Sequence, residues 1–274
     1  MCDICVMNSV KEKMLSRRGF FKGGAAITAS VAAAAGGVTT RPTFANTHGD
    51  VVDMTHMTDE TFPTFFGTPG ISYDKMFDFA ENGFNLYNLT IMEHTGTHID
   101  APLHFSADGQ SVDEIPLGNL LCPLVKIDIA ARAAENADTQ VTPDDLQTWI
   151  DAHGDIPDGA CVAMYSGWGE KVRTDGFRNA DDEGGLHFPG FHVETTQMLI
   201  ENTGAVSIAV DTLSLDHGPS ADFAVHYAWL PTNRYGIENM AGLADVPAHG
   251  ATLVVGAPKI GRGTGGPARI FAMV

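Results

Sequence analysis

The residues of this chain that could do chemistry gather in one short run, His94-Thr95-Gly96-Thr97-His98-Ile99-Asp100-Ala101-Pro102-Leu103-His104-Phe105. The run holds three imidazoles and one carboxylate, which are the ligand types that bind zinc, manganese and iron. Such a set can hold a divalent ion and still leave one histidine for proton transfer. The alternative is a group of polar residues on a solvated strand or loop, but such clustering of histidines is rare there. The run therefore indicates a metal-dependent hydrolase.

Gly96 and Pro102 oppose a helix over this run, although its first two histidines have the i, i+4 spacing of a helical zinc motif. We expect an extended segment, in which these two histidines share one face with Gly96 and Asp100. Gly96 would then leave room for an ion between the histidines. Because the chain must turn at Pro102, His104 can approach the same site from another angle.

The elements that must position these residues are mostly strands. Apolar runs, most of them bounded by Gly, Pro or Asp, predict strands at Leu86 to Met92, Leu124 to Ile129, Ala160 to Tyr165, Ala205 to Val210, Ala251 to Val255 and Arg269 to Met273. Capping signals predict helices from Thr142 and over His192 to Asn202. The segment Asp175 to Gly190 is expected to be an exposed loop at the border of a pocket. No internal repeat is found, so we predict one mixed α/β domain.

The first 45 residues have the pattern of a twin-arginine export signal. Ser16-Arg17-Arg18-Gly19-Phe20-Phe21-Lys22 precedes an apolar, alanine-rich stretch, and Thr43-Phe44-Ala45 offers a cleavage site. We therefore predict a signal peptide over residues 1–45, a mature domain over residues 46–274 and a periplasmic or exported protein delivered by the twin-arginine export machinery. The stretch is too short and too rich in Gly and Ala for a stable membrane span, so no membrane association is expected after cleavage, with an uncleaved tether as the alternative.

The mature chain is expected to be strongly acidic. The full sequence has 16 basic and 34 acidic residues and a formal charge of -18, and removal of residues 1–45 moves this charge to about -22. Nucleic acid and anionic membrane surfaces are therefore excluded as partners. Cys122 and Cys161 remain after cleavage, and the sequence leaves open whether they pair.

Two further polar segments lie downstream. His226 and Glu238 are twelve residues apart, and spacing alone favours a packed histidine and a surface glutamate. Asp211-Thr212-Leu213-Ser214-Leu215-Asp216 follows a predicted strand, where either a site residue or a turn is expected.

The histidine run resembles the H-x-G-T-H-x-D-x-P-x-H-F signature of the cyclase family, which includes bacterial kynurenine formamidases and isatin hydrolases. Other segments resemble family blocks in family order, namely Asp53 to His56, Asp211 to Asp216, His226 to Glu238 and Gly263 to Arg269. The resemblance implies a β/β/α swivelling-type fold with a central mixed sheet. It also implies a homodimer or homotetramer with the metal sites inside each subunit.

The same resemblance implies roles for individual residues. A first divalent ion would be held by His94, His98 and Asp100. His226 and Glu238 would complete a second site, with Asp100 and Glu238 as bridging carboxylates. His104 matches the residue that accepts and donates the proton. The expected cofactor is Mn²⁺ or Zn²⁺, with one or two ions per subunit.

The expected activity is hydrolysis of a cyclic amide of the isatin type by a metal-activated water. Candidates for the wall of an aromatic pocket are Phe62, Phe65, Phe66 and Trp168, with core packing as the alternative. An arylformamidase acting on N-formylkynurenine, a lactone or cyclic imide hydrolase and a metal-assisted lyase or dehydratase remain alternatives. Export argues against a formamidase of tryptophan catabolism, which would act inside the cell. A non-catalytic metal-binding or ligand-binding protein is the last alternative.

Overall fold

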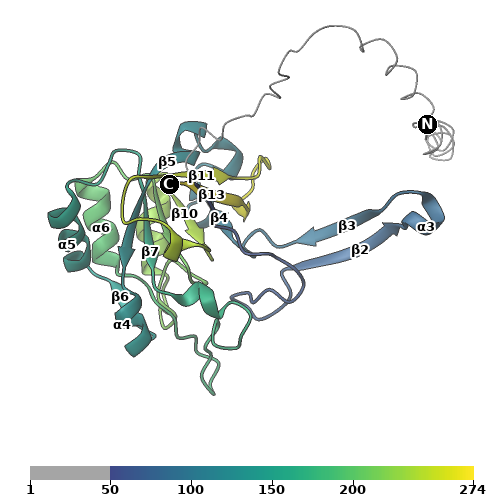
Figure 1. Ribbon diagram of the computed structural model, residues 1–274, viewed down its shortest axis with the longest axis horizontal. Helices are drawn as coiled ribbons and strands as arrows, with labels where there is room; N and C mark the ends of the chain where they lie inside the picture. Colours follow the sequence, from purple (N-terminus) through teal and green to yellow (C-terminus); the bar gives the residue numbers. More distant parts are fainter. Residues whose placement is uncertain (1–49) are drawn as a thin grey trace, which may run out of the picture. The chain divides into compact units, whose positions relative to one another are not determined.

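A computed structural model describes residues 50–274 of the chain (Figure 1). The predicted signal peptide over residues 1–45 lies outside the described residues. Among residues 50–274, no helix has the length and apolar character that crossing a membrane requires.

A nine-stranded mixed sheet forms the centre of the protein, with the strand order β1-β13-β11-β5-β7-β9-β10-β4-β12. Its strands are β1 Val51–Asp53, β4 His98–Asp100, β5 Leu121–Asp128, β7 Cys161–Tyr165, β9 Ser207–Val210, β10 Tyr235–Glu238, β11 Ala251–Gly256, β12 Gly265–Pro267 and β13 Arg269–Met273. The four strands β5, β7, β9 and β10 run parallel, and the remaining pairs are antiparallel. Nearly every residue of β7 and β9 is buried, as expected for parallel strands covered on both faces.

Helices cover one face of this sheet. They are α4 Ala130–Glu135, α5 Pro143–His153, α6 Val193–Asn202 and α7 Ala224–Trp229, and Figure 1 shows α5 and α6 side by side. Thr142 and Asp145 form a capping box that begins α5. Leu146 of α5 and Leu199 of α6 pack with Val125 and its neighbours on this face. The alternating residues of β5, Cys122 and Leu124 among them, join a second core on the opposite face.

The remaining elements of the main body are short. Single-turn 3₁₀ helices are η1 Pro102–Phe105, η2 Val112–Glu114, η3 Leu117–Leu120, η4 Trp168–Lys171, η5 Leu230–Thr232 and η6 Leu243–Asp245. A two-stranded sheet joins β6 Gln140–Val141 to β8 Gly190–Phe191. Cys122 and Cys161 are both buried, and each keeps a free thiol, so they do not pair.

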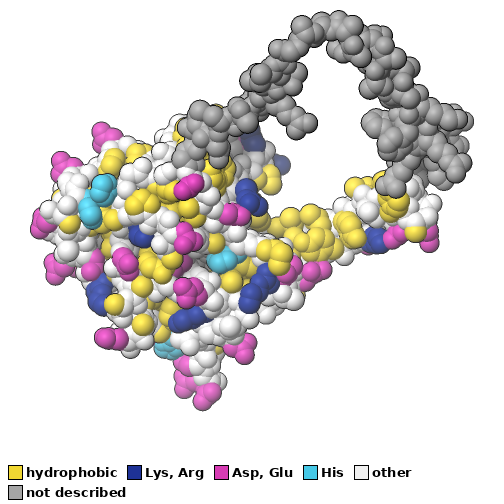
Figure 2. Space-filling view, viewed as in Figure 1, with side chains coloured by type: hydrophobic (Ala, Val, Ile, Leu, Met, Phe, Trp, Pro, Cys, Tyr) yellow, Lys and Arg dark blue, Asp and Glu magenta, His cyan; other side chains and the backbone are white. Residues whose placement is uncertain are grey.

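A hairpin is formed by β2 Ile71–Phe77 and β3 Leu86–Ile91, with the short helix α3 Phe79–Asn82 between them. Residues 74–88 belong to a different compact unit from the rest of the described residues. The hairpin is largely exposed although it is rich in large apolar residues, and Figure 2 shows such side chains gathered along it. The exposed set is Tyr73, Met76, Phe79, Leu86, Tyr87, Leu89 and Ile91.

The predicted mixed α/β domain with a central mixed sheet is confirmed, as are both predicted helices and the six predicted strands. One strand differs in its surroundings, because the apolar run from Leu86 forms the exposed strand β3 of the hairpin instead of a core strand. The segment Asp175 to Gly190 is exposed as expected over its middle, residues 179–185, yet Phe177 and Phe188 within it are fully buried. The segment therefore packs its own small core, with Trp168, and does not line the cavity of the site described below.

Candidate active site

The histidine run is not extended over its full length. The strand β4 begins only at His98, because Gly96 adopts a left-handed conformation with φ 65° that turns the chain just before it. A Cβ atom on Gly96 would lie 2.0 Å from Oγ1 of Thr58. The space beside Gly96 is therefore filled by Thr58, and the expectation that it leaves room for an ion is wrong.

The register of β4 with β10 brings the second polar segment to the first. Residue Glu238 pairs directly with His98, and Gly236 pairs with Asp100. His226 comes from α7 and is buried. Residues far apart in the sequence therefore meet at one point of the sheet, and Glu238 is a buried site residue instead of a surface glutamate.

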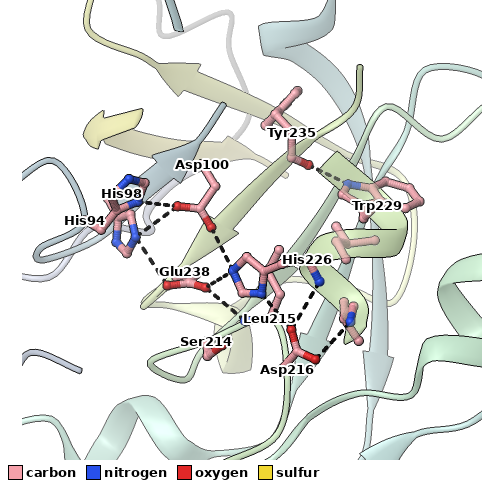
Figure 3. A network of polar contacts seen from close by, with 12 residues as sticks. His94, His98, Asp100, Ser214, Leu215, Asp216, His226, Trp229, Tyr235 and Glu238 are labelled. Atoms are coloured by element: carbon pink, nitrogen blue, oxygen red, sulfur yellow. Dashed lines mark hydrogen bonds and ion pairs between the residues drawn. The ribbon is translucent and has the colours of Figure 1, made fainter. Parts of the chain in front are cut away.

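Two buried carboxylates and two buried imidazoles face one another there (Figure 3). Nε2 of His98 lies 3.3 Å from a carboxylate oxygen of Asp100 and 3.3 Å from one of Glu238. Nε2 of His226 lies 3.2 Å from the other oxygen of Glu238 and 3.6 Å from the other oxygen of Asp100. Each carboxylate therefore places one oxygen beside each imidazole. A carboxylate that bridges two metal sites has this arrangement.

The other ring nitrogen of each of these two histidines, Nδ1, is already hydrogen-bonded. Nδ1 of His98 donates to the carbonyl oxygen of Gly96 at 2.9 Å, and Nδ1 of His226 donates to the carboxylate of Asp216 at 2.6 Å. This pattern fixes the rings and directs Nε2 at the carboxylates, as in histidines that bind metals. Within the described residues, neither Nε2 of His98 nor Oδ2 of Asp100 makes a hydrogen bond. A divalent ion fits this set of donors, since it would satisfy both buried atoms at once.

The charges of the site favour a cation as well. Burial works to lower the pKa of His98, but the carboxylates of Asp100 and Glu238 outweigh burial and raise this pKa to about 10. Burial opposes the ionised form of Asp100, yet the neighbouring imidazoles of His226 and His94 hold its pKa well below the usual value. The carboxylates therefore create a strongly negative field, which protons on the imidazoles or a bound cation would balance.

His94 and His104 lie beside this cluster. Nδ1 of His94 is 2.6 Å from a carboxylate oxygen of Asp100, and its Nε2 is 3.0 Å from Oγ1 of Thr264. The ring of His104 stacks on that of His94, with centroids 3.8 Å apart. One nitrogen or oxygen atom from each of His94, Asp100 and His104 lies within 4.8 Å of the others, as do atoms of His98, Asp100 and Glu238. The structure thus brings all six predicted metal and catalytic residues together.

The environment of His104 keeps its ring neutral. Burial, together with the positive fields of His94 and His226, lowers the pKa of His104 to about 4, against the opposing effect of the carboxylates. The position of His104 follows from Pro102, which begins the 3₁₀ helix η1 and turns the chain back toward the site. A neutral imidazole at this place can accept a proton near neutral pH.

A cavity of about 290 Å³ opens on these residues. Its lining includes polar residues of the site, and four aromatic rings accompany them, two of which pack directly against the histidines. The polar residues are His98, His104, His226 and Glu238, and the aromatic residues are Phe65, Phe66, Phe105 and Phe223. Phe223 has a left-handed backbone with φ 51°, which is uncommon for a bulky residue and is found mostly at functional sites. The cavity therefore joins polar groups to an apolar pocket that suits a small aromatic ligand.

Of the four predicted pocket residues, Phe65 and Phe66 line this cavity. Phe62 is 3% exposed and packs edge-on against Phe177. Trp168 is 1% exposed, and its indole N–H donates to the carbonyl oxygen of Phe177 at 2.8 Å. Both belong to a local core, which was the alternative to a pocket role.

Two polar residues of the cavity were missed in the sequence. Oγ of Ser214 and Oδ1 of Asn239 are buried and have no hydrogen-bond partner within the described residues. Ser214 lies in the segment Asp211 to Asp216, and Asn239 directly follows Glu238, so proximity to suspected site residues was the available signal. Phe105 closes the histidine run, whereas Phe223 lines the cavity without any sequence signal that separates it from core residues.

The segment Asp211 to Asp216 contains both a residue that holds a turn and a residue that supports the site, the two roles expected from the sequence. Asp211 accepts hydrogen bonds from the backbone N–H groups of Ser166 and Trp168 and so holds a neighbouring turn, while burial raises its pKa to about 6. Asp216 instead accepts from Nδ1 of His226 and from backbone N–H groups at the start of α7. Asp216 is therefore the positioning residue of the site.

Replacing Asp216 by asparagine is expected to weaken metal binding by about 10- to 100-fold, because the charged partner that orients His226 is lost. Competition with a chelator measures this affinity. Asp222→Asn is the matched control, since Asp222 is an exposed carboxylate of the same loop. Equal affinities of the two variants would show that Asp216 does not support the site.

The fold and the site define a class of protein. A family model described as Putative cyclase matches residues 52–217, more than half of the chain. The chain belongs to this family, which confirms the resemblance read from the histidine run, and it is a hydrolase of that family.

Individual relatives are similar over most of the chain. Isatin hydrolase of Roseibium aggregatum is 32% identical over 219 residues, which cover 76% of this chain and 82% of that protein. Kynurenine formamidase of Salinibacter ruber is 31% identical over 193 residues, or 69% of this chain and 80% of that protein. Among solved structures, isatin hydrolase A from Labrenzia aggregata bound to benzyl benzoate has a TM-score of 0.77 and 34% identity, covering 82% of this chain and 93% of its own.

Proposed function

We propose that this protein is a divalent-metal-dependent hydrolase that opens a cyclic aromatic amide of the isatin type at its C–N bond. The observation that carries the proposal is the direct opening of an aromatic-walled cavity onto a cluster of buried histidines and carboxylates. The similarity to isatin hydrolases supports the substrate class.

The residues that would hold the metal are those brought together at the sheet. His94, His98 and Asp100 would bind one ion, and His226 and Glu238 would complete a second site, with Mn²⁺ or Zn²⁺ as the ion. When bound, a divalent ion lowers the pKa of water and polarises a carbonyl group.

The chain's own residues would supply the proton transfers and the orientation of the substrate. The neutral ring of His104 accepts a proton from the attacking water and returns it to the nitrogen of the breaking C–N bond. Oδ1 of Asn239 can accept a hydrogen bond from the amide N–H, and the hydroxyl of Ser214 can donate one to a carbonyl oxygen. The phenylalanines hold the aromatic ring and exclude water.

A second candidate is hydrolysis of N-formylkynurenine, which the similarity to kynurenine formamidases favours. The two activities share the metal ligands and the proton transfer through His104. They differ in whether the C–N bond that breaks is part of a ring.

The test is hydrolysis of isatin, N-formylkynurenine, a cyclic imide and an aryl lactone by chelator-stripped protein, with and without added Mn²⁺ or Zn²⁺. Turnover of isatin that returns with one ion would support the proposal and identify the metal. Turnover of N-formylkynurenine alone would favour the second candidate. No turnover of the whole panel with metal bound would contradict both and favour a lyase or dehydratase.

We also propose export to the periplasm by the twin-arginine machinery and a homo-oligomeric state. The apolar hairpin supports the oligomer, because a contiguous exposed apolar surface marks a protein interface and a two-stranded sheet is only marginally stable alone. A second copy of the chain would cover it.

Substitution of Leu89 and Ile91 together by lysine is expected to dissociate the oligomer, because two charges would be buried in the interface. Size-exclusion chromatography with light scattering measures the mass. Leu117→Lys is the control, since Leu117 is 82% exposed on η3, outside the hairpin. An unchanged mass of the folded double variant would place the interface elsewhere.

A further inference from the structure

A groove of about 400 Å³ shares no residue with the catalytic cavity. It lies where the end of α5 meets the middle of β5 and the start of β11. The residues around it include Trp149 and His153 of α5, Asp155 just after that helix and His249 just before β11. Among these, the two histidines are exposed, whereas the tryptophan is buried.

The two histidines lie close together although they come from distant parts of the sequence. The ring centroids of His153 and His249 are 4.8 Å apart, and the rings are tilted by 48°. Trp149 contacts both, with its ring centroid 4.9 Å from that of His153 and 6.5 Å from that of His249. The groove thus presents two imidazoles against one indole.

The distance between the two imidazole ring centres is in the range expected when both rings bind one ion. A metal about 2.0–2.1 Å from a ring nitrogen lies about 3.2 Å from the ring centre. Two such rings then have centres about 4.5 Å apart for a right angle at the metal and about 5.2 Å apart for a tetrahedral angle. The observed 4.8 Å lies between these values. The spacing of the two rings is therefore compatible with both imidazoles binding one ion.

The indole of Trp149 provides a second, independent observation. Trp149 is 7% exposed, and its Nε1–H has no acceptor within the described residues. A buried N–H donor without a partner is unfavourable. An ion held by two imidazoles keeps water at its remaining positions, and such a water could accept this hydrogen bond once the indole, whose Nε1 is closed off from solvent, rotates toward the groove.

We propose that His153 and His249 form a second, non-catalytic site for a divalent transition-metal ion of the Ni²⁺, Cu²⁺ or Zn²⁺ class. Imidazole is a preferred ligand of these ions. The bound ion joins the end of α5 to the segment before β11. This proposal does not depend on the proposed hydrolase activity.

The test is a titration of the metal-loaded full chain with Ni²⁺, followed by calorimetry and by tryptophan fluorescence. The wild type is expected to bind one more equivalent of Ni²⁺ than His153→Ala or His249→Ala, and this equivalent should quench fluorescence. Trp149→Phe should keep the additional equivalent and lose the quenching. His187→Ala is the control, because His187 is paired with Asp138 outside the groove.

Equal binding by the wild type and both histidine variants would overturn the proposal. Loss of the equivalent in the His187→Ala control as well would also overturn it, since the site would then not be specific to the pair. Substrate hydrolysis by His153→Ala is expected to equal that of the wild type. A failure of the hydrolase proposal therefore leaves the Ni²⁺ count unaffected, and the two proposals can be tested separately.

Discussion

Replacement of His104 by alanine is expected to lower kcat by about 10²- to 10⁴-fold, the usual contribution of a general acid and base. The bound metal should remain, because the buried cluster of His98, Asp100, His226 and Glu238 is left complete. The reason for the loss is that the leaving nitrogen would depart without a proton. Steady-state kinetics together with metal analysis of the same sample measures both quantities.

His187→Ala serves as the control for His104→Ala, because it also removes an imidazole but lies outside the cavity. Full activity of a metal-replete His104→Ala variant would remove His104 from the mechanism. Loss of both metal and activity would show that His104 is a metal ligand and not a proton carrier.

Replacement of Asp100 by asparagine is expected to lower metal affinity strongly. The loss should exceed the factor of about 10 to 100 predicted for Asp216→Asn, which removes only a residue that orients a ligand. Asp100 is fully buried, and its two oxygens face the imidazoles of His94, His98 and His226. An amide of the same shape cannot supply the negative charge that balances an ion. Activity should fall to that of the chelator-stripped protein.

Metal content after dialysis and hydrolysis of the preferred substrate measure the effect of Asp100→Asn, and circular dichroism shows whether the fold is kept. Asp216→Asn provides the intermediate comparison, since it changes only the partner of a ligand. Retention of the wild-type metal content in folded Asp100→Asn would show that Asp100 does not bind the ion.

The sequence predicts those structural features that depend only on residues close together in the chain. The helix α5 is foreseen because Thr142 and Asp145 cap it, and β7 and β9 because continuous apolar runs form buried strands. The histidine run is recognised because its ligands lie close together in the sequence. Its turn at Gly96 was missed, since the same glycine is compatible with an extended chain and with a left-handed one.

What the sequence does not reveal depends on contacts between distant segments. The pairing of Glu238 with His98 requires the register of β10 with β4, which no local pattern encodes. Phe62 and Phe65 are three residues apart and of the same type, yet only Phe65 lines the cavity. Which one does so is decided by the packing of Phe62 against Phe177, a contact that only the folded chain makes.

The hydrogen bonds from Nδ1 of His98 and His226 have a consequence for how the protein would acquire the proposed ion. Their acceptors, the carbonyl oxygen of Gly96 and the carboxylate of Asp216, belong to the folded chain, so the rings are held in place before any ion arrives. Uptake would then be an exchange in which the entering ion displaces protons from imidazoles whose pKa is raised. Apparent affinity should rise about tenfold per pH unit for each proton released, and an acidic surrounding would empty the protein of metal while leaving it ready to be refilled.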